Sequence, residues 1–337
     1  MPAPRVSILL PVRDAASTLE RCLRSLAAQT LHDHEVVVVD DGSRDDSGRI
    51  LEAAAARDPR VRVWRTPARG LVAALNAAAR EARAPILARM DADDVSLPER
   101  LARQWQRLQE PGAPDMLGTC VRLRCEDGEP TSGMTAYVDW QNGLVGHEAI
   151  LRDLYVESPL VHPSAAFPAS ALSSLGGYRD FDGPEDYDLW LRAARAGMRF
   201  GKEPEVLLEW WDSPLRLTRA SARYAAERFF ALKAEAVEQA FLRPSRPVVI
   251  WGAGPIGKGW SRELRARGHK VVAFVEVAPR KIGERIHDAP VMAVEDAAGL
   301  GPALHLAAVG QPGARVAIRE AAARIGLRDG IDLVAVA

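Results

Sequence analysis

The chain has 337 residues, of which 47% are hydrophobic and 26% charged, and its formal net charge is −1. This length suits two domains, and the composition is that of a soluble globular protein. The small net charge excludes a strong bulk attraction to nucleic acid or to an anionic membrane. The three cysteines, Cys22, Cys120 and Cys125, lack metal-site pairing, so we expect reduced thiols.

No apolar run has the roughly 20 residues that a membrane-spanning helix needs. We therefore expect a cytoplasmic protein without a transmembrane segment, with a peripheral location at the inner membrane as the alternative.

The first two thirds of the chain alternate apolar runs with amphipathic stretches. The runs predict strands over residues 6–10, 35–39, 61–64 and 86–90, and the amphipathic stretches predict helices over 17–28, 46–57, 71–83, 97–109 and 185–196. Strands and helices that alternate through short links predict an α/β fold with a doubly wound, mostly parallel sheet. Residues 116–168 show no regular pattern, and we expect an irregular insertion that covers a site.

A second α/β unit is predicted after a long helix over residues 220–240. Strands are expected over 248–251, 270–275, 305–309 and 332–336, and a helix over 258–267. We expect a first domain over residues 1–215, a helical linker over 216–246 and a small second domain over 247–337.

Three acidic clusters follow one another along the chain. Asp40-Asp41 and Asp91-Ala92-Asp93-Asp94 come where predicted strands end, and Glu185-Asp186 opens a predicted helix. Taken singly, each has an ordinary explanation as a turn, a helix cap or a pair of first-turn acids. Taken together, carboxylates at the carboxyl edge of one sheet repel one another and predict a divalent cation, Mg²⁺ or Mn²⁺, shared with a diphosphate.

At these residues the chain resembles family-2 glycosyltransferases, which have the GT-A fold. The donor half of that family is matched by Leu10-Pro11, Val39-Asp40-Asp41-Gly42-Ser43, Gly70 with Asn76, and the Asp91–Asp94 cluster. The acceptor half is matched by His162-Pro163-Ser164, Gly176-Gly177-Tyr178 and the segment from Glu185 to Arg192. The resemblance covers roughly the first two thirds of the chain.

The resemblance implies a role for each matched position. Asp186 would be the catalytic base, Asp93 the metal ligand, and Asp91 a contact near the ribose and diphosphate. The further donor-binding positions are Pro11, Val12, Arg13, Asp14, Asp41 and Arg69.

Three more residues are additional candidates. Glu185 is the neighbour of the base, and His162 is either an acceptor contact or a structural histidine. Many family members carry a metal-holding His after the acidic helix, where this chain has Asp212 instead.

The implied function is the inverting, metal-dependent transfer of a sugar from a nucleotide sugar to an acceptor hydroxyl, in surface glycan or glycoconjugate synthesis. The partners would be a nucleotide sugar and a sugar or glycoconjugate acceptor, and no nucleic acid. Two alternatives remain at this stage: a non-catalytic nucleotide-binding or regulatory protein, and a sugar-phosphate nucleotidyltransferase. The second is weakened because the loop after residue 10 lacks glycine.

The predicted second domain begins with a glycine-rich turn. Gly252, Gly254 and Gly257 follow a strand and open a helix, and Glu276 ends the next strand. This context is that of a dinucleotide-binding turn, so the domain is interpreted as Rossmann-like and as a possible nucleotide site. The alternative is a turn of the same kind that serves packing alone. The oxidoreductase interpretation is weaker, since no residues for hydride transfer follow.

Overall fold

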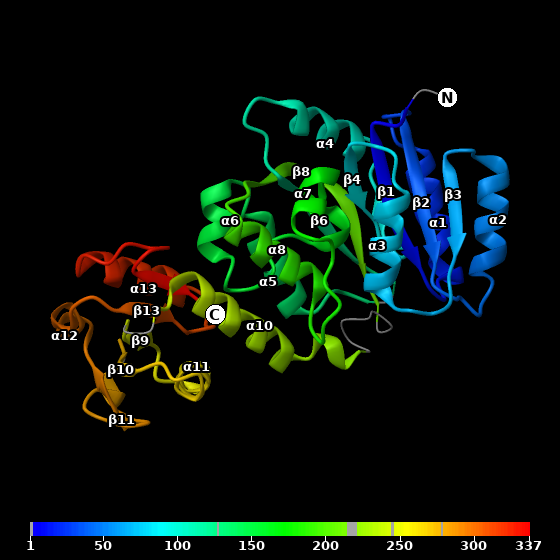
Figure 1. The fold of residues 1–337 in the computed structure, drawn as a ribbon. Helices are drawn as coiled ribbons and strands as arrows, with labels where there is room; N and C mark the ends of the chain where they lie inside the picture. The colour runs from blue at the N-terminus through cyan, green and yellow to red at the C-terminus, as the bar shows by residue number, and fades with distance from the viewer. Residues whose placement is uncertain (1–2, 127, 214–220, 244–245, 278) are drawn as a thin grey trace. The chain divides into compact units, whose positions relative to one another are not determined.

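The computed structural model describes residues 3–126, 128–213, 221–243, 246–277 and 279–337 (Figure 1). It divides into two compact units. The first unit is Met1–Ile150 with Pro159–Ala225, and the second is Leu151–Ser158 with Ala226–Ala337. The helix expected as a separate linker belongs to the second unit in this division. The expected boundary between residues 215 and 216 lies outside the described residues.

The first unit is built on an eight-stranded sheet of order β3-β2-β1-β4-β7-β6-β8-β5. The strands are β1 (Val6–Val12), β2 (His34–Asp40), β3 (Val61–Arg65), β4 (Ile86–Arg89), β5 (Val95–Ser96), β6 (Met116–Cys125), β7 (Ala166–Pro168) and β8 (Phe200–Asp212). Strands β3, β2, β1 and β4 are parallel neighbours, as are β6 and β8, while β7 and β5 run antiparallel. This confirms the predicted α/β class with a mostly parallel sheet.

Every residue of β1 and β2 is buried. Each fully buried Val, Leu or Ile side chain of such strands contributes roughly 1.5–3 kcal/mol. Strands buried on both faces need helices on both sides, and the right-handed crossover rule gives the arrangement. Helices α1 (Ala16–Ala27) and α2 (Ser47–Arg57) cover one face, and α3 (Leu71–Glu81) crosses the other in front of the strands (Figure 1).

Within the described residues, the remaining helices of the first unit follow the fourth strand. They are α4 (Arg100–Gln109), α5 (Ser132–Asn142), α6 (His147–Asp153, which ends in the second unit), α7 (Ala169–Ser174), α8 (Glu185–Arg195) and the 3-10 turns η1 (His162–Ser164) and η2 (Ala222–Tyr224).

The expectation of an irregular insertion over residues 116–168 is wrong, because the regular elements β6, α5, α6, η1 and β7 occupy most of this stretch. Residues 116–125 form β6, whose parallel partner β8 lies some 80 positions later and was not predicted. Polar residues interrupt β8, and one of them, Lys202, is buried. Its ammonium group donates to the side-chain oxygen of Gln141 at 2.7 Å and to the carbonyl of Pro159 at 3.1 Å. Burial lowers the pKa of Lys202 to about 7.

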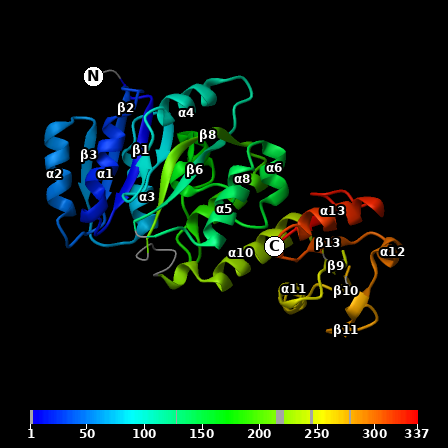
Figure 2. The ribbon, with the colours of Figure 1, turned by 180° about the vertical axis from the view of Figure 1, so that it is seen from behind.

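The second unit contains a six-stranded sheet of order β11-β12-β10-β9-β13-β14. The strands are β9 (Val248–Trp251), β10 (Val271–Val275), β11 (Arg285–Ile286), β12 (Ala289–Met292), β13 (Leu304–Ala307) and β14 (Leu333–Ala335). The described helices are α10 (Ala226–Phe241), α11 (Pro255–Ala266), α12 (Val294–Ala297) and α13 (Ala314–Arg324). Two 3-10 turns, η3 (Pro279–Lys281) and η4 (Ala298–Leu300), are also present. All neighbours are parallel except β11 with β12. Figure 2 shows α11 and α13 beside β9 and β13.

Helix α10 is part of the core of this second unit. Ala234 and Val237 are fully buried there, and Phe230 packs edge-on against Trp260 of α11 with ring centroids 5.0 Å apart. Residues 151–158 join the same core, because Tyr155 packs edge-on against Phe241 at 5.3 Å. This packing explains why the helix groups with the second unit rather than forming an independent linker.

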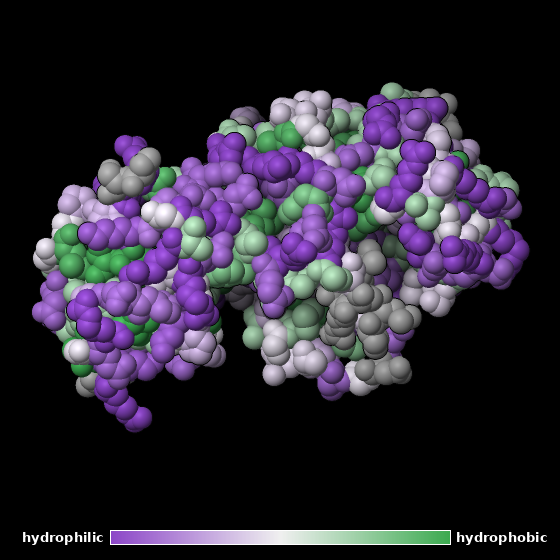
Figure 3. Space-filling view, turned by 60° about the horizontal axis from the view of Figure 1, so that its bottom comes forward, coloured by the Kyte–Doolittle hydropathy of each residue, from purple (hydrophilic) through white to green (hydrophobic). Residues whose placement is uncertain are grey.

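Hydrophilic residues cover most of the face shown in Figure 3. Among the described residues, the large hydrophobic side chains that are exposed all lie in the second unit: Ile256, Val277, Ile282, Val316 and Ile331. In the described part of the chain, none of the helices combines the length and the apolar character that crossing a membrane requires.

Candidate active site

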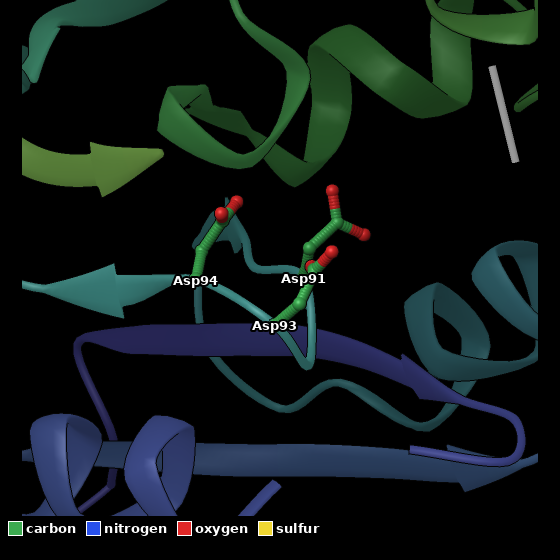
Figure 4. A group of neighbouring side chains, drawn as sticks. All are labelled: Asp91, Asp93 and Asp94. Carbon is green, nitrogen blue, oxygen red and sulfur yellow. The ribbon is translucent and has the colours of Figure 1, made fainter. Parts of the chain in front are cut away.

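The acidic loop after β4 brings three carboxylates together. One oxygen from each of Asp91, Asp93 and Asp94 lies within 4.8 Å of the others, and the side chains point to the same side of the loop (Figure 4). Asp91 and Asp93 are half-buried, whereas Asp94 is fully buried and accepts a hydrogen bond from the backbone N–H of Trp211 at 2.8 Å. The loop therefore presents two accessible carboxylates, and its third carboxylate also fastens it to β8.

Helix α1 fixes the backbone of this loop. Arg21 donates to the carbonyl of Asp93 at 2.9 Å, and the thiol of Cys22 lies 3.3 Å from the carbonyl of Asp91. The Arg21 guanidinium also lies 3.7 Å from the ring centroid of Trp211, a cation–π contact. Burial raises the pKa of the Cys22 thiol well above its ordinary value, so this cysteine is inert.

Two buried arginines lie beneath the acidic loop. Arg89, the last residue of β4, donates to the Asp91 carboxylate at 2.6 Å and to the carbonyl of Met90. Arg100 donates to the carbonyl of Arg89, and burial lowers the pKa of Arg100 to about 10. Burial also disfavours the charged form of Arg89, but the charge of Asp91 opposes it and the pKa of Arg89 is raised. Neither residue was predicted from the sequence, although Arg89, a charged residue inside an apolar strand before an acidic cluster, carried a usable signal.

The predicted donor-binding residues lie at the carboxyl ends of β1, β2 and β3. Pro11 and Val12 are buried in β1, while Arg13, Asp14 and Arg69 are exposed in the loops that follow. Such an edge is where ligands bind in open α/β sheets.

Asp41 is buried and holds a turn in place. Its two carboxylate oxygens accept the backbone N–H groups of Arg69 at 2.7 Å and Gly70 at 2.8 Å, and Arg13 lies 3.6 Å away. Gly70 has φ of 93°, a conformation that glycine adopts without strain. Asp41 thus shapes the rim of the predicted donor site through the backbone of residues 69–70.

Asp14 ties the first loop to the second. Its φ is 49°, its carboxylate accepts the N–H of Arg44 at 2.7 Å, and its own N–H donates to Ser43 Oγ at 3.1 Å.

The first turn of α8 carries two acids in different environments. Glu185 is buried, with one oxygen accepting the Tyr224 hydroxyl at 2.6 Å and the other 3.6 Å from His162 Nδ1. Burial raises the pKa of Glu185 against this hydrogen bond and the charges of Arg89 and Arg223. Asp186 is half-buried, and its Oδ1 accepts the N–H of Tyr187 at 2.7 Å.

His162 belongs to a buried network. Its Nε2 lies 2.9 Å from the hydroxyl of Tyr178, and burial, followed by the charge of Arg89, lowers the pKa of His162 well below its ordinary value. The ring is therefore neutral at neutral pH, and its contact with Glu185 is a polar contact rather than an ion pair. This environment favours the structural interpretation of His162 over that of an acceptor contact.

The pKa of the Tyr178 hydroxyl depends on the carboxylates of both the acidic loop and α8. Burial raises its pKa, and the negative charges of Glu185, Asp186 and Asp91 raise it further, whereas Arg89 lowers it. The backbone of Tyr178 is fixed by Asn76, which donates to its carbonyl at 2.8 Å and accepts its N–H at 3.0 Å. Asn76 and the Gly176-Gly177-Tyr178 motif, matched separately in the sequence, are thus in direct contact.

Asp212 ends β8 and is buried. Among the described residues, it is not a member of the Asp91–Asp93–Asp94 group.

The glycine-rich turn of the second unit follows β9. Gly252 has φ of 109°, and a Cβ on Gly257 would lie 1.9 Å from the Gly252 carbonyl, so both positions require glycine. A Cβ on Gly254 would meet nothing within 4 Å. Glu276 accepts the N–H of Ala253 at 3.1 Å, which brings the end of β10 against this turn.

The site in the first unit can therefore do two things chemically. Half-buried carboxylates on the loop after β4 are hard oxygen ligands suited to Mg²⁺ or Mn²⁺. A half-buried carboxylate at the N-terminus of α8 can accept a proton.

Comparison with known proteins agrees with this arrangement. A relative from Escherichia coli, "O-antigen biosynthesis glycosyltransferase WbnJ", is 30% identical over 188 residues, which is 56% of this chain and 70% of the relative. A relative from Erwinia amylovora, "Amylovoran biosynthesis glycosyltransferase AmsE", is 31% identical over 208 residues, which is 60% of this chain and 74% of the relative.

Solved structures share the fold at lower identity. The S. aureus TarS fragment 1–349 in complex with UDP-GlcNAc has a TM-score of 0.56 and 21% identity, and the likeness covers 71% of this chain and 68% of that one. The mannosyltransferase PcManGT from Pyrobaculum calidifontis, in complex with GDP-Man and Mn²⁺, has a TM-score of 0.56 and 20% identity over 97% of this chain and 82% of that one.

The family model described as "Glycosyl transferase family 2" matches residues 7–176, about half of the chain. This stretch runs from β1 through the acidic loop to the Gly176-Gly177 turn. The chain belongs to glycosyltransferase family 2 and is a glycosyltransferase.

Proposed function

We propose that this glycosyltransferase moves a sugar from a nucleotide sugar to an acceptor hydroxyl with inversion at the sugar C1, with the help of a divalent cation. The observation that carries the proposal is the convergence of carboxylates on the loop after β4, where one oxygen from each of Asp91, Asp93 and Asp94 lies within 4.8 Å of the others. The first turn of α8 adds Asp186, a half-buried carboxylate next to Glu185, which belongs to the buried network of His162 and Tyr178. A donor-side and an acceptor-side acidic group are thus both present in the first unit.

The donor side fits a divalent cation. Asp93, with Asp91 beside it, would hold the ion, because their oxygens converge within 4.8 Å and neither is fully buried. The Mn²⁺ in the PcManGT complex supports a metal on this fold. A bound divalent cation neutralises negative charge on a leaving diphosphate. Arg89 keeps the Asp91 carboxylate in place through its 2.6 Å contact.

The acceptor side fits a general base. Asp186 is in the first turn of α8, where the helix macrodipole favours the ionised carboxylate. Glu185 is occupied with Tyr224 and His162, so Asp186 is the better candidate of the two.

The proposed reaction exchanges one bond at the sugar C1 for another. The acceptor oxygen forms a bond to C1 of the sugar while the bond between C1 and the diphosphate oxygen breaks. The acceptor proton passes to Asp186, and the nucleoside diphosphate leaves with the bonding electron pair. A single displacement from the face opposite the leaving group inverts the anomeric configuration. Holding both substrates in line supplies much of the rate enhancement.

The relatives narrow the substrate class. WbnJ and AmsE are named for O-antigen and amylovoran biosynthesis, and TarS and PcManGT are solved with UDP-GlcNAc and GDP-Man. We infer a UDP- or GDP-sugar donor and a glycan or glycoconjugate acceptor in polysaccharide synthesis.

A panel of UDP-, GDP- and dTDP-sugars with Mn²⁺ tests the proposal by thermal shift and product formation. A donor at ~100 times its dissociation constant should add about 2.7 kcal/mol of stability. The product's anomeric configuration, read by nuclear magnetic resonance, tests inversion. Retention of configuration, or equal donor binding with a metal chelator present, would contradict the mechanism.

We also propose that the second unit binds a nucleotide at the turn formed by Gly252, Gly254 and Gly257. Its parallel strands β12-β10-β9-β13-β14 follow the order of nucleotide-binding α/β units, with the turn at the point where the order reverses. Open space at Gly254 and the carboxylate of Glu276 support this second role.

Calorimetry of the full chain with NAD⁺ and with UDP, both without metal, tests the second role. We expect binding that Glu276→Ala weakens and that Asp93→Asn leaves unchanged. Binding that Asp93→Asn removes would belong to the first unit instead, and absence of any binding would favour a packing role for the turn.

A further inference from the structure

A short segment directly before α10 forms hydrogen bonds with the loop that leads into α8. In η2, the Arg223 guanidinium donates to the carbonyl of Gly183 at 2.8 Å, to the Asp180 carboxylate at 2.9 Å and to the carbonyl of Phe181. One planar, five-donor group thus holds three acceptors within four residues of chain. The loop itself is tightly folded, since a Cβ on Gly183 would lie 2.3 Å from the Phe181 ring.

The next residue of the segment reaches α8 itself. The Tyr224 hydroxyl donates to Glu185 Oε2 at 2.6 Å, a length typical of a charge-assisted O–H···O⁻ hydrogen bond. Glu185 is only 2% exposed, so few other donors can replace this one. Its second oxygen faces a neutral His162 ring at 3.6 Å, which is a weaker contact. Tyr224 is therefore the main partner that keeps Glu185 directed into the unit.

The orientation of Glu185 determines that of its neighbour. Successive residues of an α-helix point about 100° apart. Once Glu185 is fixed inward by Tyr224, the first turn of α8 cannot rotate, and Asp186 is left half-buried on an adjacent face. Arg223 fixes the approach to this turn from the other side of Pro184, the N-cap residue.

We propose that Arg223 and Tyr224 are positioning residues, which together set the direction of the Asp186 carboxylate toward the acceptor. This inference rests on the proposed role of Asp186 as the base. Both residues act through protein groups, the loop at residues 180–183 and Glu185, and both lie beyond residues 7–176, the part of the chain that matches the family model. The segment thus holds the acceptor side of the site in place, separately from the acidic loop on the donor side.

A purely structural role for the segment makes a different prediction. General loosening of the unit would weaken donor binding and turnover together. Loss of positioning alone would lower kcat and leave the donor dissociation constant unchanged, because the side chains of Arg223 and Tyr224 bond to the loop before α8 and to Glu185, on the acceptor side.

The test compares Tyr224→Phe and Arg223→Lys with the parent. Turnover is measured as release of UDP from UDP-GlcNAc and of GDP from GDP-mannose with Mn²⁺, water serving as acceptor. Calorimetry with UDP or GDP and Mn²⁺ gives the donor-side affinity. Tyr155→Phe is the matched control, because it removes the hydroxyl of a half-buried tyrosine in the second unit, and Tyr224 is half-buried as well.

We expect each of the two variants to lower kcat by about 10-fold or more, toward the ~10²-fold loss that misplacement of a reacting group by 1 Å can cause. Affinity for the nucleoside diphosphate should stay at the parent value, and Tyr155→Phe should behave as the parent. Parent kcat in both variants, or a matched loss of affinity and kcat, would overturn the inference. Asp186→Asn separates the proposed base from its proposed positioning. An active Asp186→Asn enzyme refutes the role of Asp186 as the base. An inactive Asp186→Asn enzyme beside a fully active Tyr224→Phe enzyme refutes only the positioning role of the segment.

Discussion

Arg89 and Asp91 form a salt bridge in which the two partners differ in burial. Their Nη2 and Oδ1 atoms are 2.6 Å apart, and the side chains are 1% and 29% exposed. A guanidinium keeps its charge at any ordinary pH, whereas a partly exposed carboxylate can be hydrated. The consequence of breaking the pair therefore depends on which partner is removed.

The first prediction compares Asp91→Ala with Arg89→Met. Asp91→Ala leaves the buried charge of Arg89 without its partner and should cost about 3–5 kcal/mol of unfolding free energy. Arg89→Met leaves the Asp91 carboxylate, which water can reach, and should cost about 1–2 kcal/mol of unfolding free energy. Urea unfolding of both variants beside the parent measures the difference. Equal costs, or the opposite order, would show that the Asp91 carboxylate depends on Arg89 more than its exposure indicates.

The second prediction concerns metal binding at the acidic loop. Asp93→Asn should remove the Mn²⁺ dependence of UDP or GDP binding and leave the fold intact, because the side chain is half-buried at the sheet edge and outside the core. Calorimetry with and without Mn²⁺ measures the dependence. Asp296→Asn, an exposed position in α12, is the control. The same Mn²⁺ dependence in Asp93→Asn as in the parent would refute the assignment.

The first four strands could be predicted closely from the sequence. Residues 61–64 were expected and Val61–Arg65 is observed, and residues 86–90 were expected and Ile86–Arg89 is observed. These strands are short apolar runs between turn residues, so local composition is sufficient to find them. The first two acidic clusters were found for the same reason, since each lies at the end of a strand that is visible in the sequence, whereas Glu185-Asp186 was found at the start of a visible helix.

Features that depend on distant contacts could not be predicted. Strand β8 contains a buried lysine and a proline, and its apolar pattern becomes intelligible only beside β6. Likewise, nothing near Tyr224 marks it as the partner of Glu185, 39 positions away. Buried polar networks are specified by tertiary contacts rather than by local periodicity, which is why the supporting residues of this site were missed.

The third prediction compares two glycines of the turn after β9. Gly257→Ala places a Cβ 1.9 Å from the Gly252 carbonyl and must displace backbone, so it should destabilise the second unit by about 1–3 kcal/mol or more. Gly254→Ala meets open space and has an ordinary φ of −85°, so the unit should stay folded. Hydrogen exchange of β9 and β10 in the two variants measures the contrast. Similar protection in both would show that the turn can adjust.

The fourth prediction is a pH dependence of the second unit. His305 is 1% exposed and accepts the Trp251 indole N–H at 2.9 Å, and burial lowers the pKa of His305 to about 4. The unfolded chain has a histidine pKa of about 6.5, so between these values it binds a proton that the folded state does not. Stability therefore rises with pH across this window, and falls by about 2 kcal/mol from pH 7 to pH 5.

The matched variant for this effect is His305→Asn, which keeps an acceptor for Trp251 and cannot titrate. Hydrogen exchange of β13 at pH 5 and pH 7, corrected for the intrinsic exchange rate, compares it with the parent. The prediction is contradicted if the protection of the parent changes with pH no more than the protection of His305→Asn.

The last prediction separates the two acids of α8. Asp186→Asn should lower transfer by ~10²-fold or more, the contribution of a general base, with nearly unchanged donor affinity. Glu185→Gln should have a much smaller effect, because its amide oxygen can still accept the Tyr224 hydroxyl that Glu185 binds at 2.6 Å. Rates and donor affinities of the two variants, measured side by side, decide between them. An active Asp186→Asn enzyme with an inactive Glu185→Gln one would move the role to Glu185, and full activity in both would remove this pair of acids from the mechanism.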